Sequence, residues 1–359
     1  MRGNTPILIG AIAMVGVAAW SGGAVTRSQA AALVGTTTTF APAQQEAKTG
    51  DKLRAEYKRP KVIAFPKDNP YTAAKARLGK KLYFDTRLSK GHVLSCASCH
   101  NPGFAWGDGL AKGVGHEMKQ LARRSPTIIN AAYGQIFMWD GRAGSLEEQA
   151  LGPIQADAEM ALPLPELLQR LNSIAEYKPL FDAAFPGEPI NAKSVGNAIA
   201  TYERTIVSGF APFDAWIEGD DKAISEDAKR GFALFNAKAQ CSGCHSSWRF
   251  TDDSFHDIGL KGDDVGRAKF FEDVPKAKFA FKTPGLREIS RRGPYMHDGS
   301  LATLEAVVDH YNTGGIERES RSELIKPLAL TAQEKSDLVA FLKTLTSDDE
   351  PMTVPALPR

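Results

Sequence analysis

Two short segments, each with two cysteines followed directly by a histidine, constrain this chain more than any other feature. They read CASCH at residues 96–100 and CSGCH at residues 241–245, and they contain all 4 cysteines of the chain. In the C-x-x-C-H signature of haem c, both thiols form thioethers to the porphyrin and the histidine ligates the iron. The sequence therefore predicts two covalent haem c groups. The residues expected to bind them are Cys96, Cys99, His100, Cys241, Cys244 and His245.

Three other interpretations of the paired cysteines are weaker. A four-thiolate zinc site would not need a histidine directly after each pair. A thioredoxin-like redox pair requires alternating strands and helices, and this sequence does not show that pattern. Two structural disulfides, each closing a two-residue loop, would be cramped. Haem remains the favoured interpretation.

Length and charge narrow the class of protein further. A chain of 359 residues is too long for one small core and suits two domains. A net charge of +2, with 24% charged residues, favours neither nucleic-acid binding nor an acidic interaction tail. We therefore expect no nucleic-acid partner.

The N-terminus has the pattern of a secretory signal. Arg2 precedes an apolar run from Ile7 to Trp20, which is short for a membrane span, and small residues follow with a candidate cleavage site at 28–30. We predict a signal peptide over 1–30, no stable membrane span in the mature protein, and a periplasmic location; an uncleaved anchor is the alternative. Cytochrome c maturation outside the bacterial cytoplasm agrees with export.

The two haem segments look like an internal repeat. Gly79 opens an apolar helical stretch before the first motif, and Gly231 does the same before the second. Four further segments are predicted to be helical from their apolar spacing: 165–171, 192–207, 301–311 and 331–345. In the last of these, Thr331 and Glu334 form a predicted capping box.

Sustained β-alternation is scarce, so the predicted fold is mainly α, with two cytochrome-c-like domains that each carry one haem c. The predicted divisions are a linker and N-terminal extension over 31–69, a first haem domain over 70–219, a second over 220–346 and an irregular tail over 347–359.

Beyond the haem motifs, the sequence from about Leu78 to Leu345 resembles the bacterial di-haem cytochrome c peroxidase and MauG family. The stretches that carry the resemblance are LYFDTRLS at 82–89, SPT at 125–127, WDGRA at 139–143, LEEQA at 146–150 and PYMHDG at 294–299. The resemblance implies that the first haem reacts with peroxide and that the second passes or stores electrons.

The resemblance also implies residue roles. His100 and His245 would be the proximal iron ligands, and Glu159 the distal acid/base. Gln149 would be its polar companion, Pro153 would take a further distal position, and Trp139 would lie between the haems.

The residue types suit that chemistry. A carboxylate shielded from water can carry a proton from one peroxide oxygen to the other if its pKa lies near the working pH. An indole between two haems shortens each electron transfer. Without the resemblance, Glu159 would read as a solvated surface charge and Trp139 as core packing.

The sixth ligand of the second haem separates the subclasses. The peroxidases of this family place methionine where this sequence has Tyr311, and MauG-type proteins carry tyrosine there. Beyond residue 160 only Met296 and Met352 remain. Tyrosinate is hard and anionic and favours higher iron oxidation states, whereas a thioether favours Fe(II). His310 should point elsewhere, and Tyr311 as plain packing is the alternative.

At three other positions the sequence conflicts with the family pattern or departs from it. His116 matches a movable distal histidine that caps the iron of the first haem, but this role conflicts with Tyr311, because activation by reduction needs a methionine-ligated second haem. Either His116 is a loop residue and the first iron is open or bound to water, which we favour, or the first haem is gated by another trigger. Arg124 replaces the asparagine of the family's calcium site, which leaves calcium in doubt and offers a substitute charge. Ala239 replaces a surface tryptophan that MauG uses to oxidise its protein substrate, so Trp216 or Trp248 would have to serve instead.

Three functions follow. The leading hypothesis is a periplasmic di-haem peroxidase of the MauG type, which uses hydrogen peroxide to form high-valent haem and oxidises a small electron-transfer protein or a protein substrate. The first alternative is an ordinary cytochrome c peroxidase that removes peroxide with electrons from a small cytochrome c or cupredoxin. The second is a di-haem electron carrier or redox sensor, which would not need Glu159 and Gln149.

Overall fold

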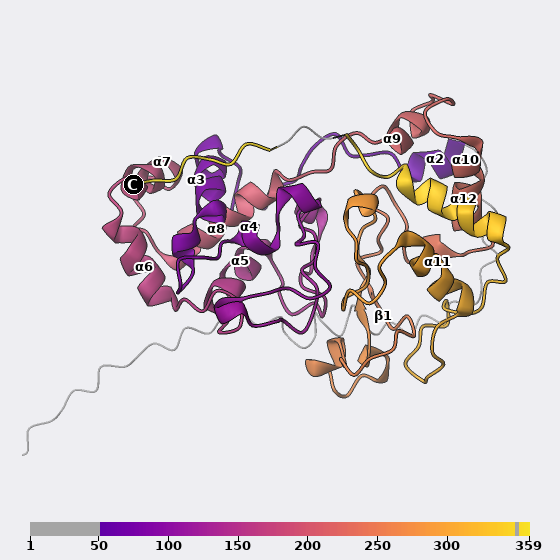
Figure 1. The fold of residues 1–359 in the computed structure, drawn as a ribbon. Coiled ribbons are helices and arrows are strands. Elements are labelled where there is room, and N and C mark those ends of the chain that lie inside the picture. Colours follow the sequence, from indigo (N-terminus) through magenta and orange to yellow (C-terminus); the bar gives the residue numbers. More distant parts are fainter. Residues whose placement is uncertain (1–50, 349–351) are drawn as a thin grey trace, which may run out of the picture.

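The computed structural model describes residues 51–348 and 352–359, which form two helical halves side by side (Figure 1). The predicted signal peptide over 1–30 and most of the predicted linker lie outside these residues. Within the described part of the chain, no helix is long and apolar enough to cross a membrane.

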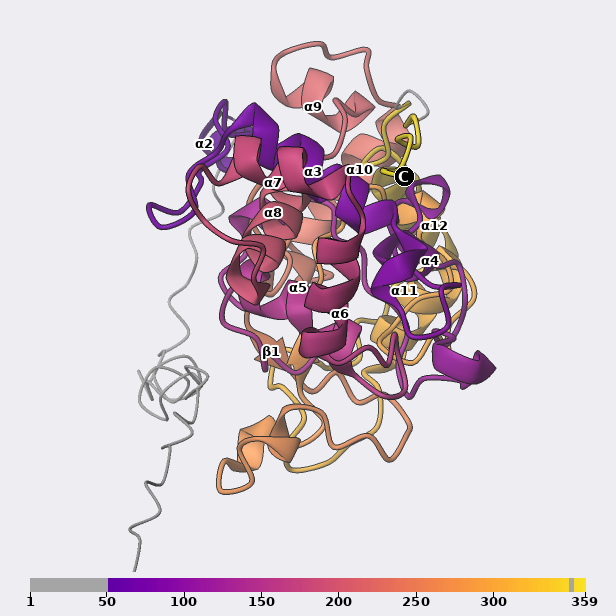
Figure 2. The ribbon, with the colours of Figure 1, turned by 90° about the vertical axis from the view of Figure 1, so that its left-hand side faces the viewer.

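Helices dominate both halves, which confirms the predicted mainly α fold. The first half contains α3 (Ala73–Phe84), α4 (Cys96–Cys99), α5 (Leu146–Gln155), α6 (Leu164–Ser173), α7 (Tyr177–Ala184) and α8 (Ala192–Arg204). Seen from the side of this first half, α6 and α7 lie in front (Figure 2). The second contains α2 (Asp51–Glu56), α9 (Pro212–Ile217), α10 (Glu226–Asn236), α11 (Leu304–Thr313) and α12 (Ala332–Lys343). Two short antiparallel strands, β1 (Phe255–His256) and β2 (Phe281–Lys282), pair Phe255 with Lys282.

The four predicted helical segments correspond to α6, α8, α11 and α12 with shifted ends. Helix α8 stops at Arg204, three residues before the predicted end, and α11 starts at Leu304 rather than 301 because Thr303 caps it. The predicted capping box of α12 is present: Thr331 accepts from the backbone of Glu334, and Glu334 accepts from that of Thr331.

The repeat inferred from the sequence is visible in how the helices cross. In the first half α3 packs on α8 at Gly79, where an added Cβ would lie 1.9 Å from the carbonyl oxygen of Ala198. In the second half α10 packs on α12 at Gly231, where a Cβ would lie 2.0 Å from the carbonyl oxygen of Asp337. Each crossing therefore requires glycine, and each lies on the α-helix that precedes a C-x-x-C-H motif.

Each half has its own hydrophobic core. Leu78, Leu82 and Ile199 are fully buried in the first core. The second is rich in aromatic rings, with Phe213 on α9 packed against Phe232 and Phe341. Helix α9 thus contributes to the second core although the predicted boundary at 219/220 assigns it to the first domain. The domain limits stay a prediction, and this packing favours a boundary before α9.

The two ends of the described chain cross over to the opposite half. Near the N-terminus, Tyr57 follows α2, is 1% exposed and packs in the second core against Phe232. At the other end the tail over 352–359 runs from beyond α12 to the first half (Figure 1), where Met352 contacts Tyr202. The predicted irregular tail is thus without helix over its described residues, yet it packs on the first core. The core of each half is therefore completed by a terminal segment of the described chain that belongs, in sequence, to the other half.

Candidate functional site

The first motif begins in the short helix α4. Hydrogen bonds hold both the backbone and the ring of His100. The Tyr83 hydroxyl donates to the carbonyl oxygen of His100 at 2.8 Å, and the ring Nδ1 of His100 donates to the carbonyl oxygen of Pro126 at 2.8 Å. Because a carbonyl can only accept, this contact fixes the proton on Nδ1 and leaves the lone pair on Nε2. Burial lowers the pKa of His100, so the ring is neutral and suited to ligate iron.

The second motif repeats this arrangement. His245 Nδ1 donates to the carbonyl oxygen of Phe250 at 2.8 Å, and burial lowers the pKa of this imidazole as well. Both histidines are therefore oriented from behind by a backbone carbonyl. This is the arrangement expected of a metal-ligating histidine.

Each histidine lines a cavity. The second cavity has about 1490 Å³ of empty space and is lined by Cys241, Cys244 and His245 together with many apolar side chains. The first has about 930 Å³ and includes His100, Trp139 and Gln149 in its wall. Space, apolar walls and a neutral imidazole together suit one haem in each half.

The cysteines do not form a zinc or disulfide cluster. Burial raises the pKa of Cys99 to about 11 and that of Cys241 to about 12, so the buried surroundings favour the neutral thiol at both positions. All four cysteines are unbridged, and the two pairs belong to opposite halves.

One helix in each half forms an equivalent wall of the cavity. Helix α5 follows the WDG segment of the first half, and α11 follows the HDG segment of the second. Counting from the first residue of each helix, Gln149 of α5 corresponds to Val307 of α11, and Pro153 corresponds to Tyr311. The first half thus has proline where the second has a phenol.

Tyr311 lines the second cavity, and the two motif cysteines are near enough to influence its phenol. Burial raises the pKa of Tyr311, with Cys244 and Cys241 acting in the same direction. The neighbouring His310 points away, as expected, because its Nε2 lies 3.0 Å from the carbonyl oxygen of Ile258. Met296 also lines this cavity.

Of the three distal residues expected at the first haem, only Gln149 is in the wall of the first cavity, where its Nε2 donates to the sulfur of Met138 at 3.7 Å. Pro153 lies inside α5, and Glu159 follows the end of that helix. Burial raises the pKa of Glu159, while the positive charge of Arg142 opposes the increase. Glu159 is therefore a shielded carboxyl group rather than a fully solvated surface charge.

His116 lies in a loop that packs on the segment containing Glu159. Its backbone N–H donates to the carbonyl oxygen of Glu159 at 2.7 Å, and its ring Nε2 lies 3.8 Å from the carboxylate of Glu117. His116 is not part of the wall of either cavity. This position is consistent with the favoured loop role.

Trp139 lies in the wall shared by the two cavities and lines both. Its ring meets that of His297, its counterpart in the repeat, edge to face, with 6.4 Å between the centroids and 69° between the ring planes. Its carbonyl oxygen accepts from the backbone of Lys282 at 2.8 Å, and the carbonyl oxygen of His297 accepts from that of Arg124 at 2.8 Å. These reciprocal bonds join the two halves at the indole.

Arg124 is buried in the same wall. Its guanidinium donates to the carbonyl oxygen of Arg292, and its own carbonyl oxygen accepts the Trp139 indole N–H at 2.9 Å. A positive side chain therefore occupies the position at which the resemblance implies calcium.

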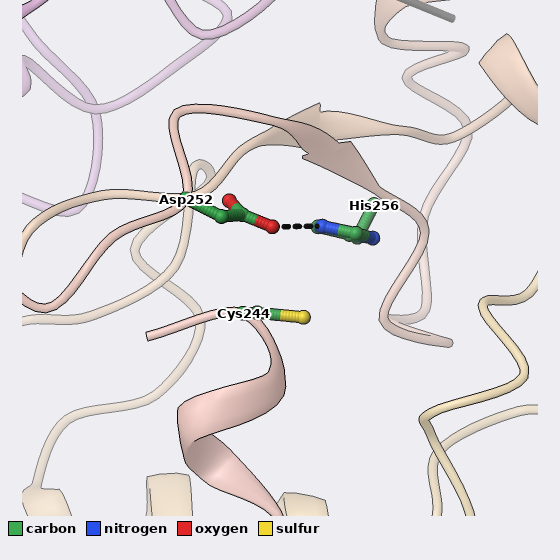
Figure 3. Close-up of side chains that lie close together, drawn as sticks. All are labelled: Cys244, Asp252 and His256. Carbon is green, nitrogen blue, oxygen red and sulfur yellow. Dashed lines mark hydrogen bonds and ion pairs between the residues drawn. The ribbon is translucent and has the colours of Figure 1, made fainter. Parts of the chain in front are cut away.

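Sequence reasoning missed one polar group beside the second motif. His256 Nε2 lies 2.7 Å from the carboxylate of Asp252, and both side chains are close to Cys244 (Figure 3). Burial opposes protonation of His256, but hydrogen bonds to Asp252 and Cys244 outweigh it and raise the pKa to about 10. A thioether at Cys244 would remove an anionic ligand, so we do not propose a metal here. The spacing of Asp252 and His256 offered no recognisable signal.

Trp216 and Trp248, the two tryptophans considered for electron transfer to a protein substrate, differ in their surroundings. Trp216 is 7% exposed in the second core, with the Arg54 guanidinium 4.8 Å from its ring centroid. Trp248 is half-buried and contacts Tyr133 of the first half at 4.8 Å between centroids. Neither lines a cavity, and Ala239 lines the second one.

Comparisons with known proteins identify the class. The model of the di-haem cytochrome c peroxidase family matches residues 73–222. The chain is 53% identical over 309 residues to the methylamine utilization protein MauG of Methylorubrum extorquens, covering 85% of this chain and 88% of that protein. It is 34% identical over 311 residues to the cytochrome c551 peroxidase of Pseudomonas aeruginosa, covering 83% and 86%.

A solved structure agrees with these relatives. The crystal structure of a MauG-like protein associated with microbial copper homeostasis superposes with a TM-score of 0.75 at 34% identity, covering 81% of this chain and 95% of that one. The chain belongs to the di-haem cytochrome c peroxidase and MauG family. It is therefore a haem peroxidase, an oxidoreductase whose family binds two haem c groups.

Proposed function

We propose that this chain is a periplasmic peroxidase of the MauG type, with its haems attached through the cysteines of the two motifs. It would use hydrogen peroxide to oxidise a protein substrate or a small electron-transfer protein. The observation that carries the proposal is Tyr311 in the second cavity, at the α11 position that corresponds to Pro153 on α5. Similarity to MauG at 53% identity supports the same subclass.

Tyr311 would be the sixth ligand of the second iron. A phenolate is a hard, anionic oxygen donor, so it stabilises Fe(III) relative to Fe(II). Burial disfavours the free phenolate, and coordination to iron would offset this cost by neutralising its charge. A second haem of this kind resists reduction, unlike a methionine-ligated haem that accepts an electron before peroxide binds.

The residues beside the first haem would bind peroxide and transfer its proton rather than ligate iron. When bound, that haem would supply the two electrons that reduce hydrogen peroxide. Pro153 has no side-chain donor atom and would leave room for peroxide at the first haem, whereas its counterpart Tyr311 would bind the second iron. Glu159 would move a proton from one peroxide oxygen to the other, and Gln149 would orient the peroxide through its amide.

Trp139 would connect the two centres electronically. It lines both cavities, and its N–H is committed to the carbonyl oxygen of Arg124. An indole held in this way keeps its proton while an electron passes, so transfer between the haems needs no proton acceptor.

Rapid mixing of the fully oxidised protein with hydrogen peroxide tests the proposal. A MauG-type enzyme should react without prior reduction. An ordinary cytochrome c peroxidase should react only after one haem has been reduced, and that result would contradict the proposed subclass. Fractionation of cells that produce the full-length chain should recover the haem protein with the periplasmic fraction.

A further inference from the structure

Two buried arginines stand in the wall that separates the haem cavities. Arg124 and Arg292 are each 5% exposed, and both line the second cavity; Arg292 also lines the first. Arg292 donates Nη1 to the carbonyl oxygens of Gly285 and Arg287, at 2.7 and 2.8 Å. The Nε of each arginine is buried without a hydrogen-bond partner in the structure.

These two charges lack an obvious counter-charge in the protein. Within the described residues neither guanidinium forms an ion pair; Asp108 attracts Arg124 and Glu288 attracts Arg292, both from beyond ion-pair distance. Burial lowers the pKa of Arg292 to about 9, and repulsion from Arg124 adds to the effect. A buried charge without a partner is strongly unfavourable, so the pair implies an anion next to it.

The nearby carboxylates are already engaged. Asp253 accepts from both Arg249 and Lys282, and Asp108 accepts from the Ser125 hydroxyl at 2.6 Å. Glu288 accepts from the Ser347 hydroxyl at 2.6 Å. None of these carboxylates forms an ion pair with Arg124 or Arg292, so a direct anionic partner has to come from the cavities, and the haem macrocycle carries two propionate carboxylates.

We propose that Arg124 and Arg292 form an anion-binding site for haem propionates in the shared wall, and that Arg292 serves both haems. Guanidinium groups suit this role because they bind carboxylates through paired N–H donors. The inference rests on the two-haem enzyme described above, but not on the substrate that it oxidises. Loss of either cation leaves propionate charge uncompensated, which stabilises Fe(III) and lowers the reduction potential.

Redox titration of the holoenzyme tests the site with Arg124→Gln, Arg292→Gln and the corresponding lysine variants. Arg292→Gln should lower the potentials of both haems, and Arg124→Gln mainly that of the second. Lysine at either position should largely restore the potentials, because it keeps the charge. Arg267→Gln is the matched control: Arg267 is also buried with an unpartnered Nε, but it is sandwiched between Phe255 and Phe271 and lines neither cavity.

Unchanged potentials in both glutamine variants, or an equal decrease in Arg267→Gln, would overturn the proposal while leaving the peroxidase assignment intact. If the glutamine variants do not fold, resonance Raman spectra of the lysine variants decide. Their propionate bending bands should shift as an ammonium replaces a guanidinium, and bands identical to wild type in both would refute the site.

Discussion

The two halves of the chain share one plan and differ in the helix that faces each haem cavity. Both have a glycine crossing, a C-x-x-C-H motif, a proximal histidine held by a carbonyl, and an Asp-Gly turn before the facing helix. On α5 the facing positions carry Gln149 and Pro153, and on α11 they carry Val307 and Tyr311. The first half has a polar amide and a proline at these positions; the second has an apolar side chain and the phenol that we propose as an iron ligand.

This difference shows how a repeated cytochrome fold can divide two tasks. In the proposed function, the shared features would hold a haem in each half, and two side chains, one and two turns along the facing helix, would determine whether the iron meets peroxide or a protein ligand. Few changes would then be needed to give the two irons different roles. The following predictions test this division.

The largest effect should come from removing one attachment site. Replacing Cys241 and Cys244 by alanine should leave one haem per chain, because the second cavity then has no covalent link to its macrocycle. The second half should also lose stability, since a large apolar group leaves its core. A pyridine haemochrome assay measures the ratio. Two haems retained per chain, or haem extractable from wild type by acid-acetone, would contradict covalent attachment.

Exchanging the ligand should make the second half resemble a methionine-ligated cytochrome. Tyr311→Met should raise the potential of the second haem by a large part of the ~0.8 V that axial ligands span, and Tyr311→Phe should give a new high-spin signal. His310→Gln is the control, since His310 faces Ile258. If oxidised wild type shows the weak far-red band of thioether ligation, Tyr311 is not the ligand and Met296 becomes the candidate.

Removing the acid/base should affect only the first half. Glu159→Gln should keep both haems while slowing the reaction with peroxide about 10²-fold. In wild type the rate should increase as pH rises through the raised pKa of Glu159, because the carboxylate is the base. The variant should lose this limb of the pH profile. An unchanged rate in rapid mixing would transfer the role to Gln149.

Substituting the glycine at either helix crossing should lower the stability of the protein to a similar extent. Gly79→Ala and Gly231→Ala should each destabilise the protein by about 1–3 kcal/mol, because the new methyl group meets a backbone carbonyl. Gly152→Ala on α5 is the control: nothing lies within 4 Å of its added Cβ, so a gain of about 0.5–1 kcal/mol is expected. Thermal unfolding of the holoprotein measures all three, and a loss at only one crossing would disprove their equivalence.

The smallest effect should come from chelating calcium. With the Arg124 guanidinium bound to the carbonyl oxygen of Arg292, a divalent cation would be repelled from this wall. Prolonged dialysis against a chelator should therefore leave both potentials and the peroxide rate unchanged. Tightly bound calcium in elemental analysis, together with a reversible loss of activity on its removal, would contradict this expectation.

The sequence was most informative where chemistry imposes a pattern. The two motifs, the glycine repeat and the capping box of α12 are local signals, and the structure contains the corresponding helices. The correspondence of α5 with α11 was not predicted, because α5 was not among the predicted helices and because Thr303 places the start of α11 three residues after its predicted position. The roles of Glu159 and Tyr311 depended on resemblance, because a single carboxylate or phenol has no spacing signature.

Other features depend on contacts between distant residues. Asp252 and His256 meet because the loop after the second motif folds back to β1, and Arg124 meets Arg292 across 168 residues of sequence. Neither hydrophobic periodicity nor motif spacing predicts such long-range contacts. The same holds for Tyr57, which lies in a segment predicted to be linker and extension but is buried in the core of the other half.

The crossed ends have a consequence for the order of assembly. As the chain is synthesised, the segment with Tyr57 emerges long before the core that it completes, and Met352 emerges after the first half is otherwise finished. Cutting the chain between α8 and α9 would therefore yield two fragments, each lacking part of its own packing. The two halves are therefore separate in their cores but dependent on each other during synthesis: the second half needs a segment made before the first, and the first half needs a segment made after the second.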